Sequence, residues 1–381
     1  MPSRERIVAV TIPVGPPHTE RIRRGIFDYA AEHGNWSLRF GLDGTSISLE
    51  GLDHFKGDGV LVMPETSRDF EIARSIQLPV VNLASSDSAN TLNTVTVDNF
   101  QAGVEAGHHL IDRGYQRFAY YGVEGLHYSD ERLAGFREAT KEIGQDIEVF
   151  LEPSDLDPAT RWRTSHTELD EWLARIEKPV GLLAAHDYRA ALIHERCPSL
   201  NIHIPRDLGL VGMDDDACVC EGTKPSITSV RHDGETIGYE AASLLDRLMD
   251  EADKGTLGEP VRIQFPPAKV VVRGSTEVYV TTDPRLAAAV TYMRENFHTG
   301  IGVPDVVENM RASRRWLERA CMEQFGVSPY QFLCRLRVKQ VEILRSQNPD
   351  IRPDELVSLC GFSDTRNLNQ VCRRFADSKL N

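Results

Sequence analysis

Apolar runs of strand length alternate with amphipathic helical patterns through the first three quarters of this chain. The run IVAVTI at residues 7–12, for example, leads into a helical segment at 21–34 whose apolar residues share one face. The strand runs show no polar alternation, which indicates strands buried on both faces and therefore parallel sheets flanked by helices. Repeated units of this kind from residue 6 to about 280, without one dominant core, predict two doubly wound α/β lobes.

The pattern changes near residue 281. Asp283 is placed as a helix N-cap and Pro284 at the first helical position, and only short helices separated by turns follow. The sequence therefore predicts a two-lobed α/β domain over 1–280 and an all-α domain over 284–381. Within the first domain we expect lobe 1 at about 5–122 with part of 254–280, and lobe 2 at about 123–253.

The net charge divides at the same place. The whole chain carries −14, which argues against a protein that binds nucleic acid with its entire surface. Residues 284–381, however, hold 15 basic and 11 acidic side chains, a net of +4 that leaves −18 on the remainder. The objection to DNA binding therefore applies to the α/β domain. Because +4 is small, we expect DNA affinity to depend on dimerisation and base contacts.

Other classes of protein lack their signals here. The phosphate loop GxxxxGK[ST], the dinucleotide motif GxGxxG and the nucleophile elbow GxSxG are absent, so we expect neither an enzyme nor a cofactor. The seven cysteines contain no CxxC pair, and the adjacent His108 and His109 lack metal-binding spacing, so no metal site is expected. No run approaches the roughly 20 apolar residues of a membrane span, and no signal peptide is evident, which predicts a cytoplasmic protein.

Two helix–turn–helix units can be read in the helical domain. The first consists of VPDVVENM, the turn Arg311-Ala312 and SRRWLERACMEQFG, and the second of PDELVSLC, the turn GFSD and TRNLNQVCRRF. Ser313 begins the second helix of the first unit, and Ser363 or Asp364 does so in the second unit. The helix RLRVKQVEILRS would join the two units. Two helix–turn–helix units at this interval are a more specific sequence signal than a single unit.

This layout resembles the AraC/XylS family of transcriptional regulators. The resemblance implies two recognition helices that place long polar side chains against base edges in the major groove of double-stranded DNA. The expected DNA-binding residues are Arg314, Arg315, Glu318 and Arg319 in the first unit and Thr365, Arg366, Asn369, Gln370, Arg373 and Arg374 in the second. For any single arginine a solvated helix face explains the residue about as well, but the paired motif favours DNA for the set.

The same resemblance implies buried positions for some residues of this domain and phosphate contacts for others. Leu317 and Leu368 fit the buried side of the two recognition helices, while Arg311, Arg337 and Lys339, with Arg373 and Arg374, suit phosphates. Cys321 and Cys372 stand where the family usually has Phe, which predicts looser packing behind both recognition helices. DSKLN replaces the family's closing Gly-x-Ser/Thr-Pro.

A second resemblance is carried by TVDNFQAGVEAGHHLIDRGYQRFAYYGVEG, SDERLAGFREATKEIG and IPRDLGLVGMDDD. These segments resemble the effector domain of LacI/GalR-type repressors and periplasmic sugar-binding proteins. The resemblance implies a small sugar, with pentoses such as xylose favoured, in the cleft between the lobes. It implies Arg132 and Asp214 as hydroxyl-binding residues. His186, Asp187, His18 and Glu20 are further expected ligand-binding residues, although Asp187 also fits a structural role.

Together the two domains predict a ligand-responsive transcription factor. We expect a homodimer that binds operator DNA and whose sugar effector changes the relative arrangement of the lobes. The alternative is a solute-binding receptor protein without a transcriptional role. The helical domain and the absent signal peptide argue against that alternative.

Overall fold

The computed structural model describes residues 4–40, 49–64, 66–85, 91–143, 146–153, 166–277, 281, 283–348 and 351–375. The chain divides into two compact units, of which the first contains Met1–Leu110 with Gln116–Glu277 and the second Ile111–Tyr115 with Val278–Asn381. Within the described ranges, no helix combines the length and the apolar character that crossing a membrane requires.

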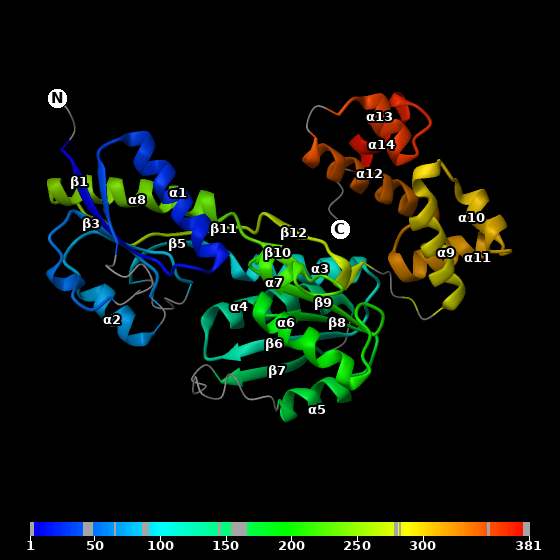
Figure 1. Ribbon diagram of the computed structural model, residues 1–381, viewed down its shortest axis with the longest axis horizontal. Coiled ribbons are helices and arrows are strands. Elements are labelled where there is room, and N and C mark those ends of the chain that lie inside the picture. The colour runs from blue at the N-terminus through cyan, green and yellow to red at the C-terminus, as the bar shows by residue number, and fades with distance from the viewer. Residues whose placement is uncertain are drawn as a thin grey trace. The chain divides into compact units, whose positions relative to one another are not determined.

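The first unit contains two six-stranded sheets (Figure 1). Its strands are β1 (Arg6–Thr11), β2 (Trp36–Arg39), β3 (Gly59–Val62), β4 (Val80–Asn82), β5 (Asn93–Val97), β6 (Phe118–Glu124), β7 (Glu148–Pro153), β8 (Val180–Ala184), β9 (Leu208–Met213), β10 (Thr228–Arg231), β11 (Arg262–Phe265) and β12 (Lys269–Val271). One sheet has the order β11-β5-β4-β3-β1-β2 and the other β12-β10-β9-β8-β6-β7. Neighbouring strands are parallel except at the edge, where β12 runs antiparallel to β10.

Helices cover both faces of each sheet, as the apolar strand runs predicted. The helices of this unit are α1 (Pro17–His33), α2 (Ser67–Ser75), α3 (Asn99–Asp112), α4 (His127–Thr140), α5 (Thr167–Arg175), α6 (Asp187–Arg196), α7 (Ala217–Glu221) and α8 (Gly234–Lys254). Val8 of β1 packs with Ile22 of α1 and Ala241 of α8, whereas its neighbour Ala9 packs with Phe70 of α2 on the other face. The apolar runs did not predict β5, β10 or the four edge strands β2, β7, β11 and β12. The residues of these edge strands are mostly half-buried or exposed.

The boundaries expected for the lobes are wrong. The first lobe contains the described residues of 6–97 and 234–265, and the second contains those of 99–110, 116–231 and 269–277. Strand β6, which was expected in lobe 1, belongs to the second sheet, and helix α8, expected in lobe 2, packs on the first sheet. Hydrophobic periodicity identifies a strand or helix but not the sheet that it joins. The chain therefore crosses between the lobes at 97–99, 231–234 and 265–269.

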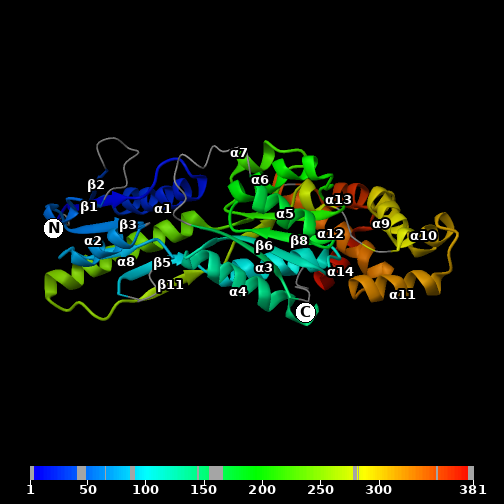
Figure 2. The same cartoon turned by 90° about the horizontal axis from the view of Figure 1, so that it is seen from below.

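The second unit is helical in the residues that the structure describes (Figures 1 and 2). Its helices are α9 (Pro284–Asn296), α10 (Val303–Asn309), α11 (Arg314–Phe325), α12 (Pro329–Gln347), α13 (Pro353–Cys360) and α14 (Thr365–Phe375). The sequence pattern predicts helices at about 285–297, 304–310, 313–324, 329–346, 353–360 and 364–375, and every observed bound lies within one residue of these. The predicted caps are also confirmed: the Asp283 side chain accepts from the backbone N–H of Arg285, and the Ser313 hydroxyl accepts from that of Trp316.

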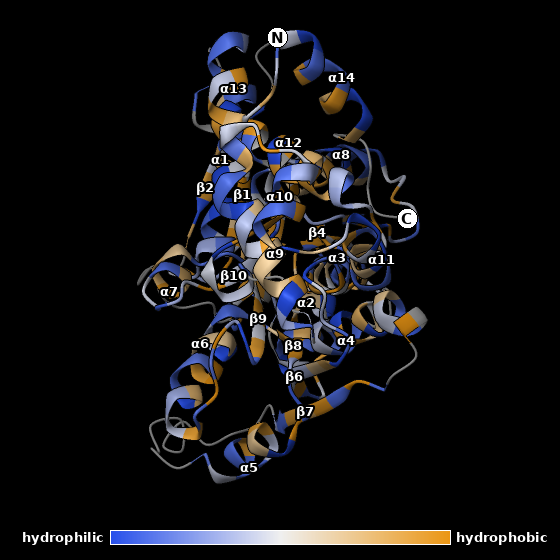
Figure 3. Cartoon of the chain, turned by 90° about the vertical axis from the view of Figure 1, so that its right-hand side faces the viewer, coloured by the Kyte–Doolittle hydropathy of each residue, from blue (hydrophilic) through white to orange (hydrophobic). Residues whose placement is uncertain are grey.

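Helix α12 takes part in two separate cores. Its first turns contribute Phe332 and Leu333 to a core with α9, α10 and α11. The following residues, including Cys334 and Val338, belong to a core with α13 and α14. Figure 3 shows the apolar and polar stripes along α14 that this packing requires. Each helix–turn–helix unit therefore has its own core, and α12 joins the two.

Candidate functional site

The predicted sugar-binding residues Arg132 and Asp214 lie next to each other. Arg132 is on α4 and is buried, and Asp214 follows the carboxyl end of β9. The Arg132 guanidinium donates from Nε to Asn99 Oδ1 at 2.8 Å and from Nη1 to the carbonyl oxygen of Ala185. Its Nη2 is 3.5 Å from Asp214 Oδ1. Two of the three nitrogens are thus fixed by the protein, and the third faces the carboxylate.

Asp214 is held as an anion among basic side chains. Burial by itself would raise its pKa, but His18, Arg132 and His232 outweigh that effect and hold the pKa of Asp214 well below its usual range. The backbone φ of Asp214 is 93°, in the left-handed region that non-glycine residues rarely adopt. A strained backbone at the end of a buried strand, carrying a carboxylate, is typical of a functional position.

His186 belongs to the same cluster. It is the N-cap of α6, where its Nδ1 accepts from the backbone N–H of Arg189 at 3.4 Å. Burial, followed by the positive charge of Arg189, lowers the pKa of His186 to about 4. Asp214 and Arg132 are also close enough to influence this pKa. His186 is therefore a neutral imidazole at neutral pH.

Asp187 makes the contacts of the structural role that the sequence also allowed for it. It is buried, and its two carboxylate oxygens accept from the Ser229 hydroxyl at 2.6 Å and from the backbone N–H of Asp216 at 2.7 Å. Burial foremost, and then Asp214, raises the pKa of Asp187 to about 7. A Cβ at Gly212 would lie 2.1 Å from Asp187 Oδ1, so no other residue fits beside it. Asp187 supports the loop that carries Asp214.

The two candidates from the first lobe differ. His18, in the first turn of α1, is near enough to Asp214 to lower the pKa of that carboxyl. Glu20 instead accepts from the backbone N–H of Gly15 at 3.3 Å and pairs with Arg23 at 3.0 Å. The structure thus brings His18 to the cluster, while the described contacts of Glu20 are with its own helix and the preceding loop.

Sequence reasoning missed three residues of this cluster. His232, directly after β10, is 5% exposed, and its Nε2 lies 3.3 Å from Asp214 Oδ1 outside hydrogen-bond geometry. Neither ring nitrogen of His232 has a hydrogen-bond partner in the described part of the chain. Asn99 orients Arg132, and the Tyr128 ring lies 5.0 Å from its guanidinium. The position of His232 at a strand's carboxyl end is a signal that could have identified it.

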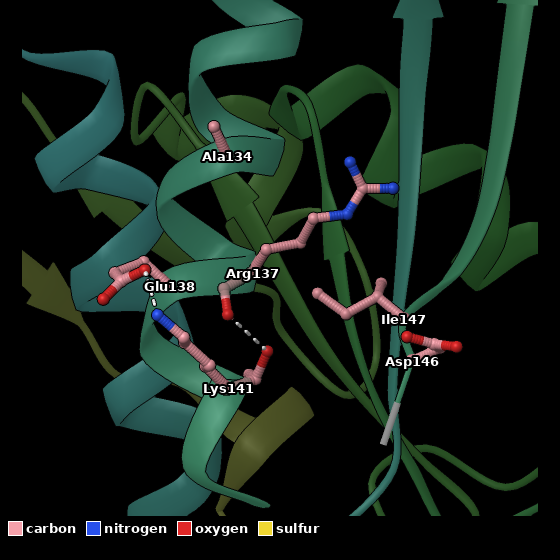
Figure 4. Close-up of a pocket in the computed structure, with 7 residues that line it drawn as sticks. Ala134, Arg137, Glu138, Lys141, Asp146 and Ile147 are labelled. Carbon is pink, nitrogen blue, oxygen red and sulfur yellow. Dashed lines mark hydrogen bonds and ion pairs between the residues drawn. The ribbon is translucent and has the colours of Figure 1, made fainter. Parts of the chain in front are cut away.

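A separate hollow of about 560 Å³ lies on the outer side of α4 (Figure 4). Arg137, Glu138, Lys141 and Asp146 are among its lining residues, and Glu138 pairs with Lys141 at 3.6 Å. None of the residues clustered around Asp214 lines it. Among the described residues, no three His, Cys, Asp or Glu side chains are placed to hold a metal ion.

The predicted DNA-binding residues form exposed faces of α11 and α14. Leu317 and Leu368 are buried, as expected, and the helices turn their polar side chains outward. The exposed members of the predicted set are Arg314, Arg315, Glu318, Arg319, Arg366, Asn369, Gln370, Arg373 and Arg374, while Thr365 is half-buried. Asp364 is the N-terminal cap of α14, because its Oδ1 accepts from the backbone N–H of Asn367 at 2.7 Å.

The two recognition helices differ in their free charge. On α11, Arg314 pairs with Glu318 at 2.8 Å and Arg319 with Glu323 at 3.8 Å. In the part of the chain that is described, Arg315 forms no such pair. On α14, neither Arg366 nor Arg373 has an acidic partner among those residues. Helix α14 therefore carries more uncompensated positive charge on its exposed face than α11.

The structure shows internal contacts for Arg337, from which we had expected a phosphate contact. Arg337 is half-buried and donates to the carbonyl oxygens of Phe297 at 3.2 Å and Ile301 at 2.6 Å, so it braces the loop before α10. The side chain of Lys339 lies outside the described residues. Cys321 is fully buried in the first core, and Cys372 packs against the second, so both fill positions behind the recognition helices.

Comparison with known proteins identifies the α/β unit. A family model described as a periplasmic binding protein-like domain matches residues 108–276. A second model, for periplasmic binding proteins and the sugar-binding domain of the LacI family, matches residues 47–158. These matches agree with the two sheets and confirm the predicted fold of this unit.

One relative spans both units. The xylose operon regulatory protein of Escherichia coli (strain K12) is 24% identical over 375 residues, which cover 95% of this chain and 92% of that protein. The chain is a homologue of the xylose operon regulatory proteins. The name of this relative describes a regulator of transcription, which agrees with the predicted class of function.

Solved structures of other proteins have the same fold as this chain. The structure of a xylose-binding transcription activator covers 99% of this chain, with a TM-score of 0.62 and 22% identity. A LacI family transcriptional regulator from Enterococcus faecalis V583, solved with bound ribose, covers 72% of this chain with a TM-score of 0.56 and 17% identity. The match to the first structure extends over the helical unit as well. The match to the second covers only part of this chain.

Proposed function

We propose that this regulator binds operator DNA as a homodimer and that a small sugar, with a pentose such as xylose favoured, controls it. The observation that carries the proposal is homology to a xylose operon regulatory protein over 95% of the chain. A LacI family transcriptional regulator that matches 72% of this chain was solved with bound ribose. The xylose operon regulatory protein matches the α/β unit and the helical unit together. Such a protein works in the cytoplasm, where its DNA lies.

The proposed sugar site is the cluster around Asp214. A sugar hydroxyl donates to a carboxylate and accepts from a guanidinium, and Asp214 and Arg132 supply these groups side by side. The neutral imidazole of His232 provides one donor and one acceptor for neighbouring hydroxyls. His186, whose Nδ1 accepts from the backbone N–H of Arg189, provides the donor at Nε2. Tyr128, whose ring packs on Arg132, offers an apolar face for the sugar ring.

The proposed DNA contacts are the exposed residues of α11 and α14. Arg315, Arg366, Asn369 and Gln370 have the donor groups that read base edges in the major groove. Arg373 and Arg374, in the last turn of α14, suit phosphates. Two such units in each protomer of a dimer would match operator half-sites related by the symmetry of the protein.

Two measurements on the full chain test the proposal. Thermal shift against a panel of pentoses and hexoses should show stabilisation by a pentose, because ligand binds the folded state. Fluorescence anisotropy with DNA from upstream of its own locus should show binding that weakens as salt rises and changes when that sugar is added. Binding of a sugar without binding of any such DNA would favour the solute-receptor alternative. A flat response to every sugar would overturn the effector assignment.

A further inference from the structure

Arg21 is a cation of the first lobe whose guanidinium reaches the second lobe. It is on α1, and its Nη2 donates to the main-chain carbonyl oxygen of Asp214. Its Nε is buried and has no hydrogen-bond partner among the described residues. The Arg21 guanidinium interacts electrostatically with four charged groups. Arg231 repels it, and the carboxylates of Asp215, Asp214 and Asp187 attract it. Arg21 thus lies at a boundary between the lobes, and no carboxylate among the residues that the structure describes is bonded to it.

Helix α1 is a firm support for this side chain. It packs so closely on α8 that a Cβ at Gly25 would lie 1.9 Å from the carbonyl oxygen of Glu235, and one at Gly238 would lie 1.9 Å from that of Ile22. A Cβ at Gly234 would lie 2.8 Å from Arg21 Cβ itself. Gly234 is the first residue of α8, directly after a crossing between lobes. The stem of Arg21 is therefore fixed to the first lobe at that crossing.

Asp214 is held equally firmly from the second lobe. Its N–H donates to the carbonyl oxygen of Val230 at 2.9 Å. The next two backbone N–H groups donate to Ser229 Oγ at 3.0 Å and to Asp187 Oδ2 at 2.7 Å. The Asp214 side chain lies against Arg132 and His232. One residue thus offers its carboxylate to the sugar site and its carbonyl to the other lobe.

We propose that Arg21 is a positioning residue that ties the first lobe to the main chain of Asp214 and so couples occupancy of the sugar site to the arrangement of the lobes. This proposal rests on the proposed function for the identity of the ligand. A hydroxyl bound to the Asp214 carboxylate displaces or reorients the residue, and the Arg21 hydrogen bond changes with it. A ligand can shift the lobes only through a contact that differs between the two arrangements, and this hydrogen bond is such a contact.

The test compares full-length Arg21→Met and Arg21→Lys with Arg24→Met. Arg24 is on the same helix but exposed, and it pairs with Asp28 at 3.1 Å, so its loss should leave the lobes unaffected. In sugar-free protein, Arg21→Met should speed amide exchange at residues 214–216 about tenfold relative to wild type, and Arg21→Lys should do so less. Exchange equal to wild type in Arg21→Met would overturn the proposal.

The second measurement uses D-xylose as the probe. Arg21→Met should bind it within about threefold of wild type, while the sugar-induced change in operator affinity should fall about fivefold or more. An undiminished change in operator affinity would overturn the proposal, as would loss of sugar binding as complete as in Arg132→Ala. Wild-type protein that binds no sugar would refute the proposed function, and the exchange measurement would still decide whether Arg21 ties the lobes.

Discussion

Nη2 of Arg132 lies 3.5 Å from Oδ1 of Asp214 in a buried site, a separation at the outer limit of a hydrogen bond. The Nε and Nη1 groups of the same guanidinium are bonded to Asn99 and Ala185. The remaining nitrogen and the carboxylate are therefore oriented but only weakly engaged with each other. The contact between Arg132 and Asp214 can therefore be replaced by two hydrogen bonds to one hydroxyl group, which accepts from Arg132 and donates to Asp214. The replacement costs little free energy.

Replacing either member of this pair should weaken sugar binding. We expect Arg132→Ala and Asp214→Asn to raise the Kd for the effector about 100-fold or more, because hydrogen bonds to buried charged groups contribute about 1.5–3 kcal/mol each. Isothermal titration calorimetry measures the change. Arg137→Ala, an exposed position on the same helix, is the control and should bind normally. Unchanged affinity in both site variants would place the sugar elsewhere.

The histidine cap of α6 should make stability depend on pH. The pKa of His186 is about 4 in the folded protein and about 6.5 when unfolded, so the unfolded state takes up the proton first. The contribution is complete above pH 6.5 and is lost as pH falls toward 4, up to about 3 kcal/mol. Protonation of Nδ1 also removes the acceptor that caps the helix.

His186→Asn isolates this effect, because asparagine caps a helix without titrating. Urea unfolding of both proteins at pH 7 and at pH 4.5 measures it, and the variant should lose less stability than wild type. Buried His232, whose pKa is also lowered by burial, acts in the same direction in both proteins. Asp187, with its raised pKa, acts in the opposite direction in both. Equal losses in the two proteins would contradict the role of His186.

The contact between α1 and α8 should tolerate no side chain at Gly238. A Cβ there would lie 1.9 Å from the carbonyl oxygen of Ile22, so the helices must separate. We expect Gly238→Ala to lower the free energy of unfolding by about 1–3 kcal/mol, as overpacking does. Gly258→Ala is the matched control, because a Cβ at Gly258 meets no atom within 4 Å. Chemical denaturation that shows no difference between the two variants would count against this packing.

The exposed arginines of α14 should separate into two classes. Arg366, in its first turn, suits a base edge, so Arg366→Ala should weaken operator binding by about 1–3 kcal/mol and non-specific binding less. Arg373→Ala should weaken both alike and reduce the dependence of affinity on salt by about one unit of slope. Anisotropy titrations with operator and scrambled DNA at several salt concentrations distinguish these outcomes. Equal losses on both DNAs for Arg366→Ala would make it a phosphate contact.

Local patterns of residues sufficed for the architecture of each unit. The unbroken apolar run of β1 indicated burial on both faces because Val8 and Ala9 point to opposite sides of the sheet and neither is polar. Asp283 and Ser313 marked helix starts because capping depends on a side chain and the backbone two or three residues away. Such features involve few residues in succession, and sequence is enough to read them.

The tertiary structure alone decided which lobe receives each element and which side chains meet. Helix α8 lies in the first lobe because its apolar face packs with α1, and β6 lies in the second because its hydrogen-bonding partners are β7 and β8. The contacts of Asp214 with Arg132, His232 and Arg21 join segments far apart in the chain. The sequence predicted most residues of the proposed sugar site by their type, and it determined the two helix–turn–helix units. The coupling between lobes depends on long-range packing, which no local pattern encodes.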